Sequence, residues 1–188
     1  WHLEESERGF SFNKNEPLDM RYNEQGETTA EKIINEYAEI EIARILTEYG
    51  EEKYSKKIAR AIVSQRKIKK ITTTFELKSI IEKAIQRHFD KIHPATRSFQ
   101  AIRIAVNGEL DSLQKFLPQA IEVLKVGGKL LVISFHSLED RIVKNFFNDA
   151  EKKGLVKIIT KKPVTVSEEE IIKNPRSRSA KLRVIVKS

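Results

Sequence analysis

Apolar residues are spaced differently in the two halves of the chain. Between residues 28 and 85 they recur at i, i+3, i+4 and i+7, which is the spacing of a helix that buries one face. This pattern predicts helices that begin near residue 28, carry residues 42–49, span about residues 52–66 and begin near residue 73. Gly50 is the predicted terminator of the second helix, because glycine adopts left-handed backbone angles readily. We therefore expect a compact helical unit over residues 28–93.

Beyond His93-Pro94 the pattern becomes that of a mixed α/β structure. A long helix is predicted first, with an interruption near Pro118, and Gly127-Gly128 ends it. Residues 129–135 are nearly all apolar, which is typical of a central strand covered on both faces. The remaining predicted elements are, in order, a capped helix from Ser137 and strands at residues 155–160 and 182–186, with a polar loop between the strands.

This order of elements describes the second half of a doubly wound α/β domain. The helical unit would be an insertion near the ligand-binding edge of the sheet, where added segments often shape a substrate cleft. We expect three parts. Residues 1–27 form a loop segment that borders the site, residues 28–93 form an inserted helical domain for substrate recognition, and residues 94–188 form the C-terminal half of the α/β domain.

Composition and charge exclude several classes of function. The chain has no Cys, which excludes disulfide frameworks, Cys-based zinc sites and thiol catalysis. Its longest apolar run is too short to span a bilayer and its first residues are acidic, so we expect a cytoplasmic protein without a membrane partner. The net charge is +8, and residues 151–188 carry 11 basic and four acidic groups. This segment favours a polyanionic partner, and a solvated lysine-rich surface is the alternative.

The end of the apolar strand carries the best local signal for chemistry. In open α/β sheets ligands bind beyond the carboxyl ends of the strands, and Ser134-Phe135-His136-Ser137 lies there, before a helix N-terminus. His136 could position a base or a phosphate, and Ser137 could donate a hydrogen bond. The alternative is that Ser137 is only the N-cap of the helix and that His136 is a structural residue at the strand end.

Aromatic and arginine side chains in three other segments could contact RNA, because aromatic faces stack on bases and guanidinium groups bind phosphate. These candidates are Phe10 and Phe12 in the N-terminal loop, Arg97 and Arg103 on the helix after Pro94, and Arg176 and Arg178 in the polar loop. The alternatives are that the phenylalanines only anchor the loop and that the arginines are only solvated. No Cys/His cluster, HExxH motif or histidine spacing indicates a metal site.

Several motifs occur together in a fixed order. They are ERGFSF at residues 7–12, PLDMR at 17–21, HPATRSFQAIR at 93–103, ISFHSLEDRIVK at 133–144 and NPRSRS at 174–179. In this combination the chain resembles the MraW/RsmH family, the bacterial 16S ribosomal RNA (cytosine-N(4)) methyltransferases, from one end to the other.

The resemblance implies a class I, Rossmann-like, S-adenosylmethionine-dependent methyltransferase sheet, present in its C-terminal portion, with an inserted all-helical domain. The acceptor would be the N4 amine of a decoding-centre cytosine in 16S rRNA of the small ribosomal subunit. Phe10 and Phe12 would shape the pocket for the unstacked base. Asp19, His136 and Ser137 are the expected catalytic group: Asp19 would orient nearby groups, and the other two would border the base. The expected phosphate contacts are Arg97, Arg103, Arg176 and Arg178.

The resemblance also places the glycine-rich cofactor loop of the family before Trp1. His2 aligns with a family Gln that contacts the cofactor, so His2 is the expected S-adenosylmethionine contact within this chain. Met20 is the only Met, which leads us to expect a processed or truncated product. A second interpretation stays open, namely a non-catalytic RNA- or ribosome-binding fragment of such an enzyme. A homodimer is a further candidate assembly.

Overall fold

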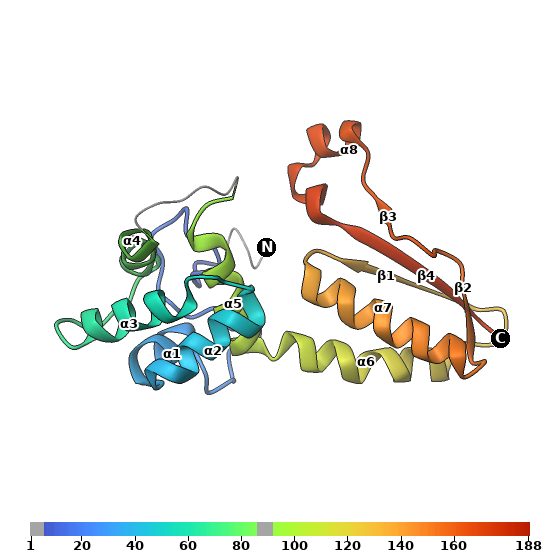
Figure 1. Cartoon of the computed structure of the whole chain (residues 1–188), viewed down its shortest axis with the longest axis horizontal. Coiled ribbons are helices and arrows are strands. Elements are labelled where there is room, and N and C mark those ends of the chain that lie inside the picture. The colour runs from blue at the N-terminus through green and yellow to red at the C-terminus, as the bar shows by residue number, and fades with distance from the viewer. Residues whose placement is uncertain (1–5, 86–91) are drawn as a thin grey trace. The chain divides into compact units, whose positions relative to one another are not determined.

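The computed structural model describes residues 6–85 and 92–188, which fall into two compact units with the boundary between Gly108 and Glu109 (Figure 1). The mixed α/β composition that the sequence predicts is confirmed, since the first unit is helical and the second combines helices with a sheet. The three-part organisation with boundaries at residues 27 and 93 stays a prediction. Within the described residues, no helix combines the length and the apolar character that crossing a membrane requires.

The first unit is built from helices and a long N-terminal loop. Its helices are α1 (Ala30–Glu36), α2 (Glu39–Gly50), α3 (Ser55–Arg66), α4 (Thr74–Ile85) and α5 (Ala95–Asn107). The four helices predicted between residues 28 and 85 are therefore present. Their apolar faces form one core, which also takes in Leu18 and Met20 of the loop, at 1% and 0% exposure. The N-terminal loop is thus fixed by burial of its own side chains.

The prediction that Gly50 ends α2 in a left-handed conformation is wrong. Glu51 adopts that conformation, with φ of 48°, and Gly50 remains the last helical residue. A Cβ at Gly50 would lie 2.6 Å from the carbonyl oxygen of Arg97 and 3.1 Å from the Cβ of Ala101, both on α5. Glycine is needed at this position because α2 and α5 pack closely, and no backbone turn requires it.

The second unit is a sheet with helices on one face. Its elements are α6 (Glu109–Val123), β1 (Lys129–Ser134), α7 (Ser137–Lys152), β2 (Val156–Ile158), β3 (Val164–Thr165), α8 (Glu168–Lys173), the 3-10 turn η1 (Pro175–Ser179) and β4 (Lys181–Lys187). The strand order is β1-β4-β2, β3 also pairs with β4, and every pair is antiparallel. Figure 1 shows α7 lying along this sheet. Leu117, Val143, Phe147 and Ile185 lie in the core beneath α6 and α7.

The interruption predicted near Pro118 lies elsewhere. Gly108 ends α5 with φ of 56°, and its N–H donates to the carbonyl of Ile104. Pro118 lies within α6, where it removes one backbone hydrogen bond. Its neighbours Leu117 and Ile121 are buried in the core of the second unit, and this packing keeps the helix continuous.

The prediction that the apolar strand is covered on both faces is also wrong for the described residues. Leu130 and Val132 of β1 pack against the core under α7, whereas Leu131 and Ile133 are 58% and 59% exposed. Alternate residues of a strand point to opposite faces, and α7 covers one face only. β1 also pairs with β4 alone among the strands of the described chain. The second unit therefore presents an apolar sheet face and an unpaired strand edge.

We expect Gly50→Ala to destabilise the protein by about 1–3 kcal/mol, because the added methyl group meets a backbone carbonyl that cannot rotate away. The better helix propensity of alanine would by itself give the opposite sign. Urea unfolding followed by circular dichroism measures the difference. Ser64→Ala, at an exposed position of α3, is the matched control and should change stability by less than about 0.5 kcal/mol. Equal stability of Gly50→Ala and wild type would contradict the close packing of α2 and α5.

Candidate functional site

Two sequence motifs of the N-terminal loop lie side by side in the first unit. The N–H of Met20 donates to the carbonyl of Arg8 at 2.7 Å, and the N–H of Gly9 donates to the Glu16 carboxylate at 2.9 Å. Gly9 has φ of 74°, and a Cβ there would lie 2.2 Å from the carbonyl oxygen of Pro17. Only glycine permits this approach, so the ERGFSF segment is fixed against the PLDMR segment.

Met20 is held in a strained conformation by α5. Its φ of 60° is costly for a residue with a Cβ, by about 1–2 kcal/mol. The Asn107 side chain compensates by donating to the carbonyl of Met20 and by accepting from the N–H of Tyr22, both at 2.7 Å. Asn107 was absent from the predicted site. The signal for it was its helical spacing from Arg103, and only the structure shows that its amide reaches the loop.

Asp19, a predicted catalytic residue, forms a two-point ion pair with Arg21. The carboxylate oxygens lie 2.6 Å from Nε and 2.8 Å from Nη2 of Arg21. The same guanidinium donates to the carbonyls of Glu24 and Gly26. Hydrogen bonding to Arg21 lowers the pKa of Asp19 below its ordinary value, so the group is ionised at neutral pH. In this structure Asp19 orients Arg21, and a catalytic role for Asp19 stays a prediction.

Phe10 and Phe12 make different contacts. Phe10 is buried and stacks on Tyr22, with ring centroids 5.2 Å apart. Phe12 is half-buried, stacks on His93 at 4.7 Å and meets Phe99 edge-on at 5.3 Å. These contacts account for the anchoring of the loop. A role for either ring in binding a base stays a prediction.

Arg97 and Arg103 both lie on α5 and are partly buried. Six positions on a helix place them about 120° apart around its axis, so they do not share one face. Their contribution to one continuous phosphate-binding surface is therefore limited by geometry. Phosphate binding by each of them stays a prediction.

In the second unit His136 lies where β1 ends and α7 begins. His136 is the N-cap of α7, and its Nδ1 accepts from the N–H of Glu139 at 3.4 Å. The Glu139 carboxylate accepts in turn from the N–H groups of Phe135, at 2.8 Å, and His136, at 3.3 Å. The alternative that Ser137 is the N-cap is wrong, because Ser137 is already helical and the extended φ of −141° belongs to His136. The catalytic roles of His136 and Ser137 stay predictions.

Acidic side chains gather around His136. One ligand-type atom from each of Glu109, His136 and Glu139 lies within 4.8 Å of the others. The Glu139 oxygens already accept backbone hydrogen bonds from the start of α7, and the His136 side chain is 9% exposed. These contacts indicate a capping cluster and give no reason to assign a metal.

A buried ion pair joins α7 to the middle of the sheet. Asp140, in the first turn of α7, accepts from Nε of Arg183 at 2.7 Å and from its Nη2 at 3.2 Å. Asp140 and Arg183 are 9% and 7% exposed, and the Lys181 ammonium lies 3.6 Å from the same carboxylate. The hydrogen bond from Arg183 lowers the pKa of Asp140. Sequence reasoning missed this pair, because its partners are far apart in the chain and both resemble surface charges.

Arg176 and Arg178 lie on η1, within the predicted polar loop. Both side chains are exposed, whereas Ser177 between them is buried and its hydroxyl donates to the carbonyl of Asn174 at 2.7 Å. The buried serine fixes the turn and leaves the two guanidinium groups at the surface. This position is compatible with phosphate contact, which stays a prediction.

The predicted residues are divided between the two units. Phe10, Phe12, Asp19, Arg97 and Arg103 belong to the first, and His136, Ser137, Arg176 and Arg178 belong to the second. Within the first unit Phe10 and Asp19 share the fixed loop, whereas the two arginines of α5 point to different sides. Within the second, His136 and Ser137 are adjacent at the end of β1.

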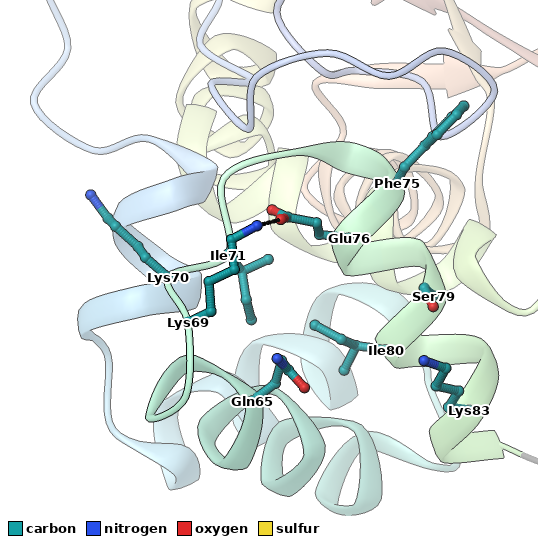
Figure 2. Close-up of a pocket in the computed structure, with 9 residues that line it drawn as sticks. All are labelled: Gln65, Lys69, Lys70, Ile71, Phe75, Glu76, Ser79, Ile80 and Lys83. Atoms are coloured by element: carbon teal, nitrogen blue, oxygen red, sulfur yellow. Dashed lines mark hydrogen bonds and ion pairs between the residues drawn. The ribbon is translucent and has the colours of Figure 1, made fainter.

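Two lysine-lined cavities of the described residues do not fit S-adenosylmethionine. His2, the predicted cofactor contact, lies outside the described residues. A cavity of about 370 Å³ in the first unit is lined by Lys69, Lys70 and Lys83 (Figure 2), and one of about 260 Å³ in the second has Lys144 among its lining residues. The sulfonium of this cofactor is a cation and would be repelled by lysines. We therefore assign no described residue to the cofactor.

Comparison with known proteins gives a match over the whole chain. A family model described as the MraW methylase family matches residues 1–188. Relatives called ribosomal RNA small subunit methyltransferase H include a protein of Leptospira interrogans serovar copenhageni, which is 51% identical over 100% of this chain and 57% of its own length. The Heliobacterium mobile relative is 52% identical over 98% of this chain and 65% of its own length. The chain thus spans about three-fifths of the length of these relatives.

We expect Asp140→Asn to destabilise the protein by about 3 kcal/mol or more at pH 7, because it leaves the Arg183 guanidinium buried without its counter-charge. The folded-state pKa of Asp140 is lowered, so the stabilisation is present above the unfolded pKa of about 3.9 and is lost as pH falls through the folded pKa. Urea unfolding at a series of pH values measures both effects. Asp149→Asn, an exposed pair with Lys152, is the control. A stability difference that is constant down to the most acidic pH would contradict this account.

Proposed function

Because the chain belongs to the MraW methylase family, we propose that it functions in the methylation of small-subunit ribosomal RNA. The proposed donor is S-adenosylmethionine, and the proposed acceptor is the N4 amine of a decoding-centre cytosine in 16S rRNA. The observation that carries the proposal is the family match over residues 1–188, which includes the strand-end motif around His136. The proposed partner is the small ribosomal subunit, in the cytoplasm.

The proposed architecture is a class I, Rossmann-like sheet with the helical segment inserted into it. In this arrangement further strands continue the sheet beyond β1, and another layer covers the face opposite α7. Two features of the second unit support it. β1 pairs on one side only among the described strands, and Leu131 and Ile133 expose apolar side chains. An unpaired strand edge next to an exposed apolar face is a surface that proteins normally cover.

The residues of this chain have positioning roles in the proposed reaction. His136 and Ser137 lie at the carboxyl end of β1, where ligands of such sheets bind, and would border the target base. Arg176 and Arg178 would hold RNA phosphates from the exposed turn η1. Asp19 would act through the fixed loop of the first unit, by orienting Arg21. The exocyclic amine of cytosine is a weak nucleophile, so correct placement of the base is the main requirement.

A second candidate function is RNA or ribosome binding without methyl transfer. The lysine-lined cavities support it, since they do not fit the donor. The two candidates differ in donor binding and agree in RNA binding.

The proposed activity is tested by methyl transfer from labelled S-adenosylmethionine to small ribosomal subunits. We expect the longest translated form of the gene that contains this sequence to produce N4-methylcytidine, detected by mass spectrometry of digested RNA. Subunits with uracil in place of the target cytosine are the control. This chain alone is assayed in parallel for RNA binding and donor binding. Labelling of another nucleoside, or of none, would contradict the proposal, and RNA binding without transfer would favour the second candidate.

The role of His136 is tested with a substitution that keeps the helix cap. Asparagine is among the best N-cap residues, so His136→Asn removes the imidazole and retains a capping oxygen. We expect the kcat for methyl transfer to fall by about tenfold or more, with a melting temperature near that of the wild type. His136→Ala, which loses the cap as well, should also melt at a lower temperature. Unchanged turnover in His136→Asn would assign His136 to capping only.

A further inference from the structure

A cavity of about 370 Å³ lies in the first unit between the end of α3, the segment that follows it, and one face of α4 (Figure 2). Its volume falls in the range of small-molecule and cofactor sites. From α4 it is lined by Glu76, Ser79 and Lys83, which are three and four positions apart and therefore share one face. Gln65 at the end of α3 faces them across the cavity.

Lysines lie at both ends of this cavity. Figure 2 shows Lys69 and Lys70 near the start of α4 and Lys83 near its far end. Glu76 and Lys83 are seven residues apart, which corresponds to about 10 Å along the helix axis. The cavity is therefore long enough for an extended ligand with negative charge at more than one point.

The single carboxylate in the lining is already engaged. Glu76 lies 2.6 Å from the Lys69 ammonium and accepts from the N–H groups of Thr72 and Thr73. The ion pair with Lys69 and these hydrogen bonds lower the pKa of Glu76 to about 2. Lys69 and the N–H groups at the start of α4 therefore balance the negative charge of Glu76, so this carboxylate repels an anion only weakly.

The other two lysines are available to a ligand. Lys70 pairs with Glu31 at 2.6 Å, but its side chain is 62% exposed, and exposed ion pairs exchange partners at little cost. Lys83 is exposed, and no ion pair or hydrogen bond links its side chain to another described residue. Two separate phosphates, one near each end of the cavity, would each meet one of these ammonium groups without breaking a buried contact.

The elements that line the cavity carry an excess of positively charged side chains. Residues 55–85, which include α3 and α4, carry nine basic and two acidic side chains. Residues 28–54, which include α1 and α2, carry three basic and seven acidic ones. The positive charge of the helical segment is thus concentrated on the elements that line the cavity.

An exposed aromatic ring lies at the rim. Phe75 is 45% exposed and outside the core of the first unit, and the Lys78 ammonium lies 5.9 Å from its ring centroid. An exposed ring beside a lysine is a combination that binds single-stranded nucleic acid, by base stacking and phosphate contact.

We propose that this cavity binds a nucleotide of single-stranded RNA, with phosphates at Lys70 and Lys83 and a base on the rim against Phe75. Gln65 and Ser79 supply hydrogen bonds inside the cavity. The choice of RNA as the ligand rests on the proposed function. The site belongs to the helical segment, and the nucleotide bound there is a different one from the cytosine that His136 would border.

The test measures binding of a fluorescent single-stranded RNA oligonucleotide to this chain by anisotropy at several salt concentrations. Phe75→Ala should weaken binding by about fivefold or more through lost stacking. Lys83→Gln should reduce the slope of log K against log salt by about 0.7, the value for one single-strand phosphate contact. Circular dichroism melts establish that each variant is folded. If Phe75→Ala does not fold, the salt slope of Lys83→Gln decides the question.

Matched controls distinguish RNA binding at this site from nonspecific electrostatic attraction between the chain and RNA. Lys56→Gln removes the same charge from an exposed position about half a turn around α3 from Gln65. Phe116→Ala removes a ring that is 52% exposed in the second unit. Both should bind RNA like the wild type. Equal losses in the Lys56 and Lys83 variants, or no loss in the Lys83 variant, would overturn the proposal.

This outcome is independent of the methyl-transfer assay. Transfer to the target cytosine with RNA binding that is insensitive to Lys83 and Phe75 would retain the proposed function and overturn the cavity site. Sensitive RNA binding without transfer in the long form would retain the cavity site and overturn the methyltransferase assignment.

Discussion

The ion pair between Asp140 and Arg183 is the contact on which the geometry of the second unit depends. Arg183 lies in β4, the strand that pairs with all the others, directly opposite Val132 of β1. Asp140 lies in the first turn of α7, so the pair fixes the start of this helix over the centre of the sheet. His136, one turn earlier, is thereby held at the end of β1. Burying two charges is costly, and their direct hydrogen bonds offset that cost.

Polar side-chain contacts have the same effect in the first unit. Asn107 binds the backbone on both sides of Arg21, through the carbonyl of Met20 and the N–H of Tyr22. The Arg21 guanidinium closes the loop by binding Asp19 and two carbonyl groups. Apolar burial of Leu18 and Met20 holds the loop in place, but it does not by itself determine a strained backbone angle. The polar contacts select one conformation. In both units, a candidate site residue is positioned by a side chain that is distant in sequence.

Local sequence patterns predicted which segments form helices and strands more reliably than they predicted what packs around each element. Helical periodicity identified α1 to α4, because each buries one face. The helix break was predicted at Pro118, because proline is a strong local signal. It lies at Gly108, where the end of α5 depends on a left-handed backbone angle that the sequence pattern does not report. The strand at residues 129–134 was found, but its exposed face was not, because composition does not report which neighbours are present. The cap at His136 was missed for a similar reason: serine is the commoner N-cap, and the geometry of Glu139 decided otherwise.

The net charge of a long segment does not show which of its charged side chains pair with one another in the folded protein. Residues 151–188 have the largest net positive charge of any segment, whereas residues 28–93 combine acidic and basic helices into a modest net charge. In the folded unit, acidic residues of α1 and α2 neutralise part of the basic surface: Glu31 pairs with Lys70, and Glu39 lies 3.8 Å from Arg60. Lys83, in the last turn of α4, has no ion-pair partner among the described residues. The ion pairs between helices, which net charge does not reveal, therefore determine which lysines of the helical segment can meet a ligand.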